Sequence, residues 1–106
     1  MENIPYCRNK LKSKNNFQEA IEFLRIINEP NRLRIIYFLN YGEQCVCNIR
    51  KSLNISQNLT SYHLKTLKDF GLVDSRQEGK KIIYSSNKKF MKKCISLLNN
   101  FLILNL

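Results

Sequence analysis

The sequence predicts a mainly helical protein with one small β-hairpin. Apolar residues recur at helical spacing over most of the chain from Phe17 onward. Two short strand-like runs stand on either side of a turn that contains Gly79. The length of 106 residues fits one domain with a modest core.

We divide the chain into an N-terminal arm, residues 1–14, and a folded domain, residues 15–106. The arm is polar and basic, contains Pro5 and carries Cys7. The N-terminus lacks the apolar segment of a signal peptide, and no run approaches the roughly 18 apolar residues of a membrane span. We therefore expect a cytoplasmic protein with no membrane partner.

The first predicted helix ends near Asn28 and is built on apolar residues at helical spacing. These residues are Phe17, Ala20, Ile21, Leu24 and Ile27. A second helix is predicted to begin at Pro30, which suits a first turn, and to end at about Leu39. Its inward residues are expected to be Leu33, Ile36 and Leu39.

A short third helix is predicted from about Cys45 to Leu53, because apolar residues keep a four-residue step. The pattern breaks at Asn54, and Ser56 is then a good N-cap for a fourth helix that ends at Gly71. The residues expected on the inward face of the fourth helix are Leu59, His63, Leu64 and Leu67. Two short helices joined by a tight turn make a candidate helix-turn-helix.

Two strand-like runs, residues 72–76 and 81–85, predict a hairpin around Gly79. A final helix is predicted from Lys88 to about Leu104. Taken in order, these elements describe a winged helix-turn-helix. The end of the last helix is apolar nearly all round, which a monomer of this size can hardly bury, so we expect a homodimer through the first and last helices. Binding to a membrane surface is the rival explanation.

The charge favours a polyanionic partner, since 18 Lys and Arg against 8 Asp and Glu give a formal net charge of +10. The second helix of a helix-turn-helix lies in the major groove with its N-terminal residues at base edges. We therefore expect double-stranded DNA as a partner. The predicted base-reading residues are Gln57, Asn58, Thr60, Ser61 and Tyr62. The predicted backbone contacts are Lys65, Lys68, Arg76, Lys80 and Lys81. For any single lysine, a solvated surface position is the simpler alternative.

Catalysis is not indicated. His63 is the sole histidine, and we interpret it as a packed helix residue. The scattered carboxylates form no paired acid and base and no nucleophile–base set. The sequence therefore predicts a protein that is not an enzyme.

Four cysteines carry the remaining chemistry, and cytoplasmic thiols are normally ligands, redox groups or packing residues before they are structural disulfides. Cys45 and Cys47 stand two residues apart at the start of a predicted helix, where two thiolates can still reach one ion. A helix N-terminus stabilises thiolate, and thiolates suit soft ions such as As(III), Sb(III), Cd(II), Pb(II) and Cu(I). Burial as small apolar residues is the alternative for this pair. We expect Cys94 to be a packing residue and Cys7 to be a third donor, within or across subunits.

Three stretches carry a family resemblance: NEPNRLRIIYFL from Asn28, EQCVCNIRKSLNISQNLTSYHLKTLKDFGLV from Glu43, and RQEGKKIIYS from Arg76. From about Phe17 to Asn99, the chain resembles the ArsR/SmtB family of metal-responsive repressors. The second stretch resembles the metal-binding box of that family, commonly Glu-Leu-Cys-Val-Cys-Asp-Leu. Gln44 and Asn48 depart from the box, whereas both cysteines match it.

The resemblance implies a dimeric winged-helix repressor that covers an operator in its apo form and derepresses resistance genes when metal binds. It implies Cys45 and Cys47 as ligands. Arsenic sensors often add a third cysteine soon after the box, which is not found around Arg50. Cadmium and lead sensors use cysteines of the N-terminal arm, which Cys7 matches. The Asp and His site on the last helix of zinc and nickel sensors has no counterpart here.

We therefore expect As(III) or Sb(III), and next Cd(II) or Pb(II), as the inducing ion. Two alternatives use the same fold. One is a repressor that responds to thiol oxidation or persulfides, with no metal. The other is a constitutive DNA-binding protein with inert cysteines.

Overall fold

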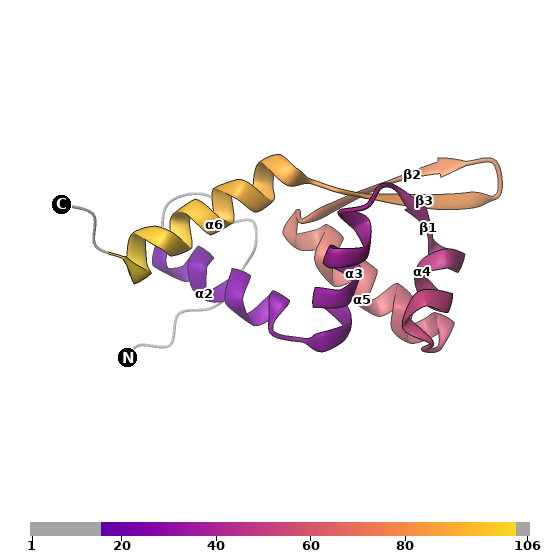
Figure 1. The fold of residues 1–106 in the computed structure, drawn as a ribbon, viewed down its shortest axis with the longest axis horizontal. Helices are drawn as coiled ribbons and strands as arrows, with labels where there is room; N and C mark the ends of the chain where they lie inside the picture. Colours follow the sequence, from indigo (N-terminus) through magenta and orange to yellow (C-terminus); the bar gives the residue numbers. More distant parts are fainter. Residues whose placement is uncertain (1–15, 104–106) are drawn as a thin grey trace.

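The structure, a computed structural model, describes residues 16–103 and has five helices and one three-stranded antiparallel sheet (Figure 1). In chain order the elements are α2 (Asn16–Ile27), α3 (Pro30–Leu39), β1 (Gln44–Cys45), α4 (Val46–Leu53), α5 (Gln57–Phe70), β2 (Val73–Glu78), β3 (Lys81–Ser86) and α6 (Lys88–Leu102). The predicted mainly helical fold with a β-hairpin is confirmed. The predicted arm, with Cys7, lies outside the described residues.

Local signals in the sequence account for the helix ends. Pro30 begins α3, and the Glu29 side chain accepts a hydrogen bond from the Arg32 backbone N–H at 3.0 Å. Ser56 caps α5 by accepting from the Leu59 N–H at 3.1 Å. The helix-turn-helix is therefore delimited by residues visible in the sequence.

Left-handed backbone positions end both helices of this pair. Asn54 follows α4 at φ 56°, and Gly71 follows α5 at φ 110°. Gly71 is also constrained by packing, because a Cβ there would lie 3.2 Å from the Phe90 ring. Glycine thus suits both the backbone conformation and the close approach of α6.

The sheet contains one strand that the sequence analysis missed. The predicted hairpin is formed by β2 and β3 with a tight turn at Gly79, which has φ 64°. The short β1 then pairs with β3, with Gln44 opposite Tyr84 and Cys45 opposite Ile83. Figure 1 shows the hairpin extending from the helices, with β1 beside β3. The β2–β3 hairpin is the wing of the winged helix-turn-helix. The backbone just before α4 is therefore hydrogen-bonded to the wing.

One core lies where the helices meet the base of the hairpin. Its buried residues are Phe23, Ile26, Ile35, Leu39, Ile49, Leu64, Leu67, Phe70, Leu72, Val73 and Cys94. Two inward predictions were wrong, since Leu33 is 53% exposed and Leu59 is 40% exposed. Ile35 and Thr60 are buried instead. The predicted inward residues Leu39, His63, Leu64 and Leu67 are buried. The prediction therefore fails at one position in each helix, because the neighbouring helices decide which residues they cover.

The first and last helices pack side by side at the end of the molecule opposite the hairpin (Figure 1). The rings of Phe17 and Phe101 meet edge to face, with centroids 5.6 Å apart. Much of the apolar surface of this pair is nevertheless uncovered. The exposed residues are Phe17, Ile21 and Leu24 on α2 and Ile95, Phe101 and Leu102 on α6. The apolar face predicted for the first helix is therefore only partly buried within one chain.

Candidate cysteine site and nucleic-acid interface

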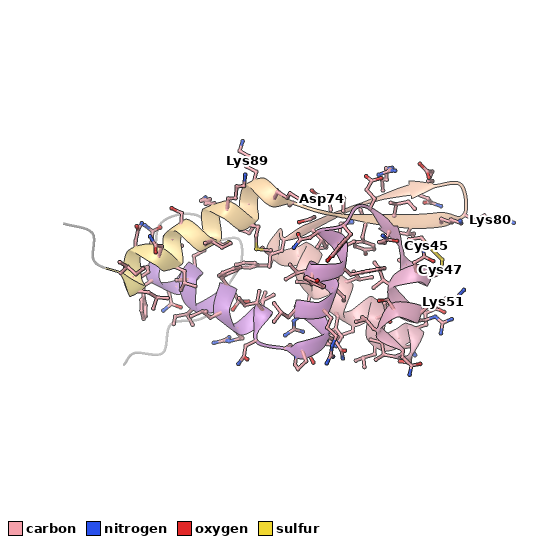
Figure 2. All side chains as sticks on the ribbon, viewed as in Figure 1. Cys45, Cys47, Lys51, Asp74, Lys80 and Lys89 are labelled. Carbon is pink, nitrogen blue, oxygen red and sulfur yellow. A yellow bond between two sulfur atoms is a disulfide. The ribbon has the colours of Figure 1, made fainter. Side chains whose placement is uncertain are left out.

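The two cysteines of interest meet at the start of α4. Cys45 caps this helix from an extended backbone conformation, and Cys47 lies in the first turn, with 5.4 Å between their Cα atoms. Because Cys45 is not helical, its side chain can turn toward that of Cys47. Figure 2 shows both side chains together, at the end of the molecule where Lys80 marks the hairpin tip. The two sulfurs therefore lie close enough to share one ligand.

The sulfur of Cys45 caps the start of α4. It accepts a hydrogen bond from the Asn48 backbone N–H at 3.4 Å, so it takes the place of the oxygen in an ordinary helix cap. Once the pair is reduced, a helix N-terminus and cations such as Arg50, which lines the same cavity, stabilise thiolates. Cys45 is buried, whereas Cys47 is exposed. One sulfur is thus held by the fold while the other faces solvent.

The structure joins the two sulfur atoms as a disulfide, where the sequence argument expected thiols. The pairing has a simple cause, since both sulfurs point to one place. A disulfide across one intervening residue closes a very short loop and restricts the unfolded chain little. It therefore contributes little to the stability of the fold. Two adjacent sulfurs fit a soft ion equally well once reduced. They supply two thiolates of a donor set.

The other two cysteines differ from this pair. Cys94 is buried in the core, and burial together with the nearby Glu19 carboxylate raises the pKa of its thiol to about 12. It therefore stays protonated and fits the predicted packing role. Cys7, the predicted third donor, lies outside the described residues. Within residues 16–103, no group of three or more His, Cys, Asp or Glu side chains is placed to hold a metal ion.

A cavity of about 390 Å³ adjoins the cysteine pair. It is lined by parts of α4, α5 and the hairpin: Cys45, Val46, Cys47, Arg50, Gln57, Ser61, Leu64, Lys80, Lys81, Ile82 and Tyr84. Four of the predicted DNA-contacting residues, Gln57, Ser61, Lys80 and Lys81, thus share one cavity with the predicted metal ligands. Arg50 was not predicted, although its position three residues after Cys47 puts both on one helix face.

The predicted recognition helix is α5, the second helix of the helix-turn-helix, and its first turns present a polar surface. Gln57, Asn58, Ser61 and Tyr62 are exposed on the first turns of α5, as base contacts require. Their amide, hydroxyl and phenol groups can donate to and accept from base edges. These four residues remain candidates for reading bases.

Thr60 is the exception and corrects the sequence analysis. Its side chain is 0% exposed, and its hydroxyl donates to the Ser56 carbonyl oxygen at 2.8 Å. A residue buried in this way cannot present its hydroxyl to a base. The error arose because Thr60 follows Leu59 in a polar stretch, and the helix turns Thr60 inward and Leu59 outward.

The residues predicted to contact the DNA backbone differ in whether their cations already have a partner in the protein. Lys65 pairs with Asp69 at 3.2 Å, and Lys68 donates to the Ser75 hydroxyl at 2.7 Å. The Arg76 guanidinium pairs with Glu43 and Glu78. Lys80 and Lys81 are exposed and make no ion pair among residues 16–103. Of the five predicted backbone contacts, the hairpin lysines are therefore the cations most available to phosphates.

His63 is a packed residue, as predicted. It is 4% exposed, and its Nδ1 accepts from Arg32 at 3.2 Å while its Nε2 lies 3.8 Å from the Glu29 carboxylate. Burial lowers the pKa of His63, with Glu29 opposing and Arg32 reinforcing the change. The neutral ring joins α5 to the start of α3.

Among residues 16–103, no helix combines the length and apolar character needed to cross a membrane.

Comparison with known proteins points to one group of regulators. A family model described as bacterial regulatory protein, arsR family, matches residues 29–75, which include the helix-turn-helix. The arsenical resistance operon repressor of Staphylococcus xylosus is 34% identical over 76 residues, which are 72% of this chain and 73% of that protein. The cadmium resistance transcriptional regulatory protein CadC of Listeria innocua is 39% identical over 80 residues, covering 72% of this chain and 67% of that protein.

The fold agrees with these relatives. A crystal structure described as a possible transcriptional regulator for arsenical resistance superposes with a TM-score of 0.70 at 31% sequence identity. The match covers 76% of this chain and 83% of that one. Sequence and fold therefore lead to the same group of proteins.

Proposed function

The chain belongs to the ArsR family of transcriptional regulators, and from this premise we propose how it works. It is a metal-responsive repressor, not an enzyme. It binds operator DNA as a dimer and leaves it when Cys45 and Cys47, with Cys7, bind a thiophilic ion. The observation that carries the proposal is the meeting of two sulfurs beside the recognition helix and the wing.

The proposal of DNA binding is supported by the exposed polar residues at the start of α5. It is also supported by Lys80 and Lys81 of the hairpin, which make no ion pair among residues 16–103. Gln57, Asn58, Ser61 and Tyr62 read bases in the major groove. Lys65, Lys68, Lys80 and Lys81 contact the phosphate backbone. We assign Arg76 to holding the wing, because two carboxylates already engage it.

Dimerisation rests on the uncovered apolar residues of α2 and α6. A second copy that covers them with its own α2 and α6 buries both surfaces at once, as a two-fold interface requires. The same symmetry places two recognition helices at a fixed separation, which suits an operator with two half-sites.

Release follows from the position of the cysteines between two DNA-binding elements. Cys45 belongs to β1, which is paired with the wing strand β3, and Cys47 belongs to α4, which packs on α5. An ion that fixes both sulfurs therefore favours one relative placement of α4 and the wing. A coupling of about 1 to 3 kcal/mol is typical and weakens operator binding roughly five- to 150-fold.

The inducer is As(III) or Sb(III), with Cd(II) or Pb(II) next. Sulfur ligands select soft ions of this kind. Several relatives that match most of this chain are named for arsenical or cadmium resistance. The regulated genes are then resistance genes.

A redox switch with the same fold is a second candidate, and the disulfide between Cys45 and Cys47 favours it. Here oxidation or a persulfide, rather than an ion, changes the placement of α4. The two mechanisms need the same residues and differ in the signal.

A titration of operator-bound protein, followed by fluorescence anisotropy, tests the proposal. With reduced protein, As(III), Sb(III), Cd(II) or Pb(II) should release the DNA, and Cys45→Ser and Cys47→Ser should abolish release. Cys94→Ala is the matched control, because its buried thiol should not matter. Cys7→Ser shows whether the arm contributes. Release by an oxidant alone, with no response to any ion, would favour the redox switch, and an unchanged ion response in Cys45→Ser would overturn the proposed ligand set.

A further inference from the structure

The cavity beside the cysteines has a composition that ion binding alone does not explain. Three cationic residues, Arg50, Lys80 and Lys81, line it together with both sulfurs. They come from different elements, α4 and the hairpin, so the fold gathers positive charge around the thiols. DNA binding accounts for Lys80 and Lys81 as phosphate contacts but not for Arg50, and a soft cation itself has no need of such charge. An anionic group does.

The size of the cavity points to a small molecule. Its volume of about 390 Å³ lies within the roughly 300–1,000 Å³ typical of ligand pockets. Polar groups from Gln57, Ser61 and Tyr84 and apolar surface from Val46 and Ile82 complete the lining. An ion bound to the two sulfurs fills only a small part of this space.

The number of ligands that As(III) binds indicates what occupies the remainder of the cavity. Trivalent arsenic binds three thiolates, and the described residues bring two of them together. A third sulfur can arrive on a small thiol, and a carboxylate-bearing thiol carries the charge that the cavity favours. Guanidinium groups pair with carboxylates through two parallel hydrogen bonds, and ammonium groups pair with them as point charges.

We propose that this cavity is a subsite for a small anionic thiol, which binds in place of Cys7 as the third ligand of As(III) held by Cys45 and Cys47. The inference rests on the proposed function. It assigns Arg50, Lys80 and Lys81 to the carboxylates of the thiol.

The loading step begins after a thiol reductant has opened the Cys45–Cys47 disulfide, and from the two thiols it is an exchange without change of oxidation state. Arsenic arrives with three carrier thiolates. Each As–S bond formed to Cys45 or Cys47 breaks one As–S bond to a carrier, which leaves as a free thiol with the proton of the cysteine. Two carriers depart and the third stays in the cavity.

The occupied subsite also bears on DNA release. Lys80 and Lys81 are proposed phosphate contacts, so carboxylates bound to them compete directly with the DNA backbone. The anionic thiol thus adds a local electrostatic effect to the change in placement of α4 and the wing.

The test uses the full chain with Cys7→Ser, so that the arm cannot supply the third sulfur. Arsenite is titrated into operator-bound protein that has first been reduced and freed of reductant. The titration is made without added thiol, with reduced glutathione, which carries two carboxylates, or with cysteamine, which carries an amine. We expect glutathione to lower the arsenite concentration for half-maximal release by roughly tenfold relative to cysteamine, the effect of one charge-assisted hydrogen bond. Native mass spectrometry should show one arsenic and one glutathione per subunit.

Arg50→Gln should reduce the difference between the two thiols, because Lys80 and Lys81 remain, and Arg50→Lys, which keeps the charge, should retain most of it. Equal effects of glutathione and cysteamine, or an arsenic adduct without glutathione, would overturn the subsite. The proposed function is judged separately, by arsenite without added thiol: if it releases the protein and Cys45→Ser prevents this, the function stands even where the subsite fails.

Discussion

Arg76 of the hairpin donates two hydrogen bonds to the carboxylate of Glu43, at 2.5 and 2.9 Å, and Glu43 stands two residues before Cys45. A third hydrogen bond, at 3.3 Å, reaches Glu78 on the same strand as Arg76. These hydrogen bonds lower the pKa of Glu43 and raise the pKa of Arg76, so the pair stays charged. Together with the pairing of β1 and β3, this contact fastens the wing to the cysteine segment.

The salt dependence of operator binding should distinguish Arg76 from Lys80. Lys80→Gln removes a cation that neutralises a phosphate, so the slope of log affinity against log salt should fall in magnitude by about 0.9 per phosphate. Arg76→Gln should change the slope little, because Glu43 and Glu78 already neutralise the guanidinium. Fluorescence anisotropy over a series of salt concentrations measures both slopes.

Glu43→Gln provides the complementary variant. It removes the principal partner of Arg76, so the freed guanidinium should approach the DNA and the slope should become steeper. The double variant Glu43→Gln with Arg76→Gln should return the slope to that of Arg76→Gln. A decrease of the slope in Arg76→Gln as large as in Lys80→Gln would contradict the holding role.

Thr60 and Ser61 should separate stability from DNA binding. Thr60→Val removes a buried hydrogen bond, so the free energy of unfolding should fall by about 1 kcal/mol while operator affinity stays the same. The Ser56 carbonyl oxygen still accepts from the Thr60 backbone N–H at 3.0 Å, which limits the cost. Ser61→Ala should weaken operator binding without changing stability. Urea unfolding and anisotropy measure the two effects, and reversed results would restore Thr60 as a base contact.

Local signals made most elements predictable. Ser56 and Gly71 mark the ends of α5 through their own side-chain and backbone chemistry, and Gly79 marks the turn of the hairpin. The two cysteines could be placed at the start of α4 because a helix start is also a local property. Each of these features depends on residues within a few positions of one another.

Features that depend on distant residues were not predictable. The strand β1 has two residues, too few for an alternating pattern, and it exists because Cys45 meets Ile83 across the fold. Helical spacing selected Leu33 rather than Ile35 because α3 carries apolar residues on more than one face. Likewise, the cavity joins Arg50 to Lys81 through tertiary packing alone. These features needed the structure.

The stability of the protein should fall in mild acid because of His63. Burial lowers the pKa of His63, so the unfolded chain binds a proton more readily than the folded chain. The stabilisation is complete above the ordinary pKa of 6.5 and is lost as the pH falls below it toward the lower folded value. Urea unfolding at about pH 7.5 and about pH 5.5 measures the loss.

His63→Gln should flatten the dependence on pH over this range, because a neutral amide replaces the ring. The chain has one histidine, so no second imidazole can mask the effect. The variant should be less stable at neutral pH, since the contact with Arg32 is altered. Equal losses in wild type and variant would show that another group titrates.

The apolar surface of α2 and α6 should control both assembly and DNA affinity. Leu102 on α6 and Tyr41 after α3 are each 72% exposed in one chain, which makes them matched sites for a new charge. Leu102→Glu should shift the protein to monomer, because a second copy can no longer cover the surface without burying a carboxylate. Tyr41→Glu should leave the dimer intact. Analytical ultracentrifugation measures the two states.

The same variant should bind DNA more weakly. A monomer engages one half-site at a time, so Leu102→Glu should also lose roughly a hundredfold in operator affinity. A dimeric Leu102→Glu variant would show that a different surface joins the subunits, and a monomeric wild type with full affinity would show that operator binding needs no dimer.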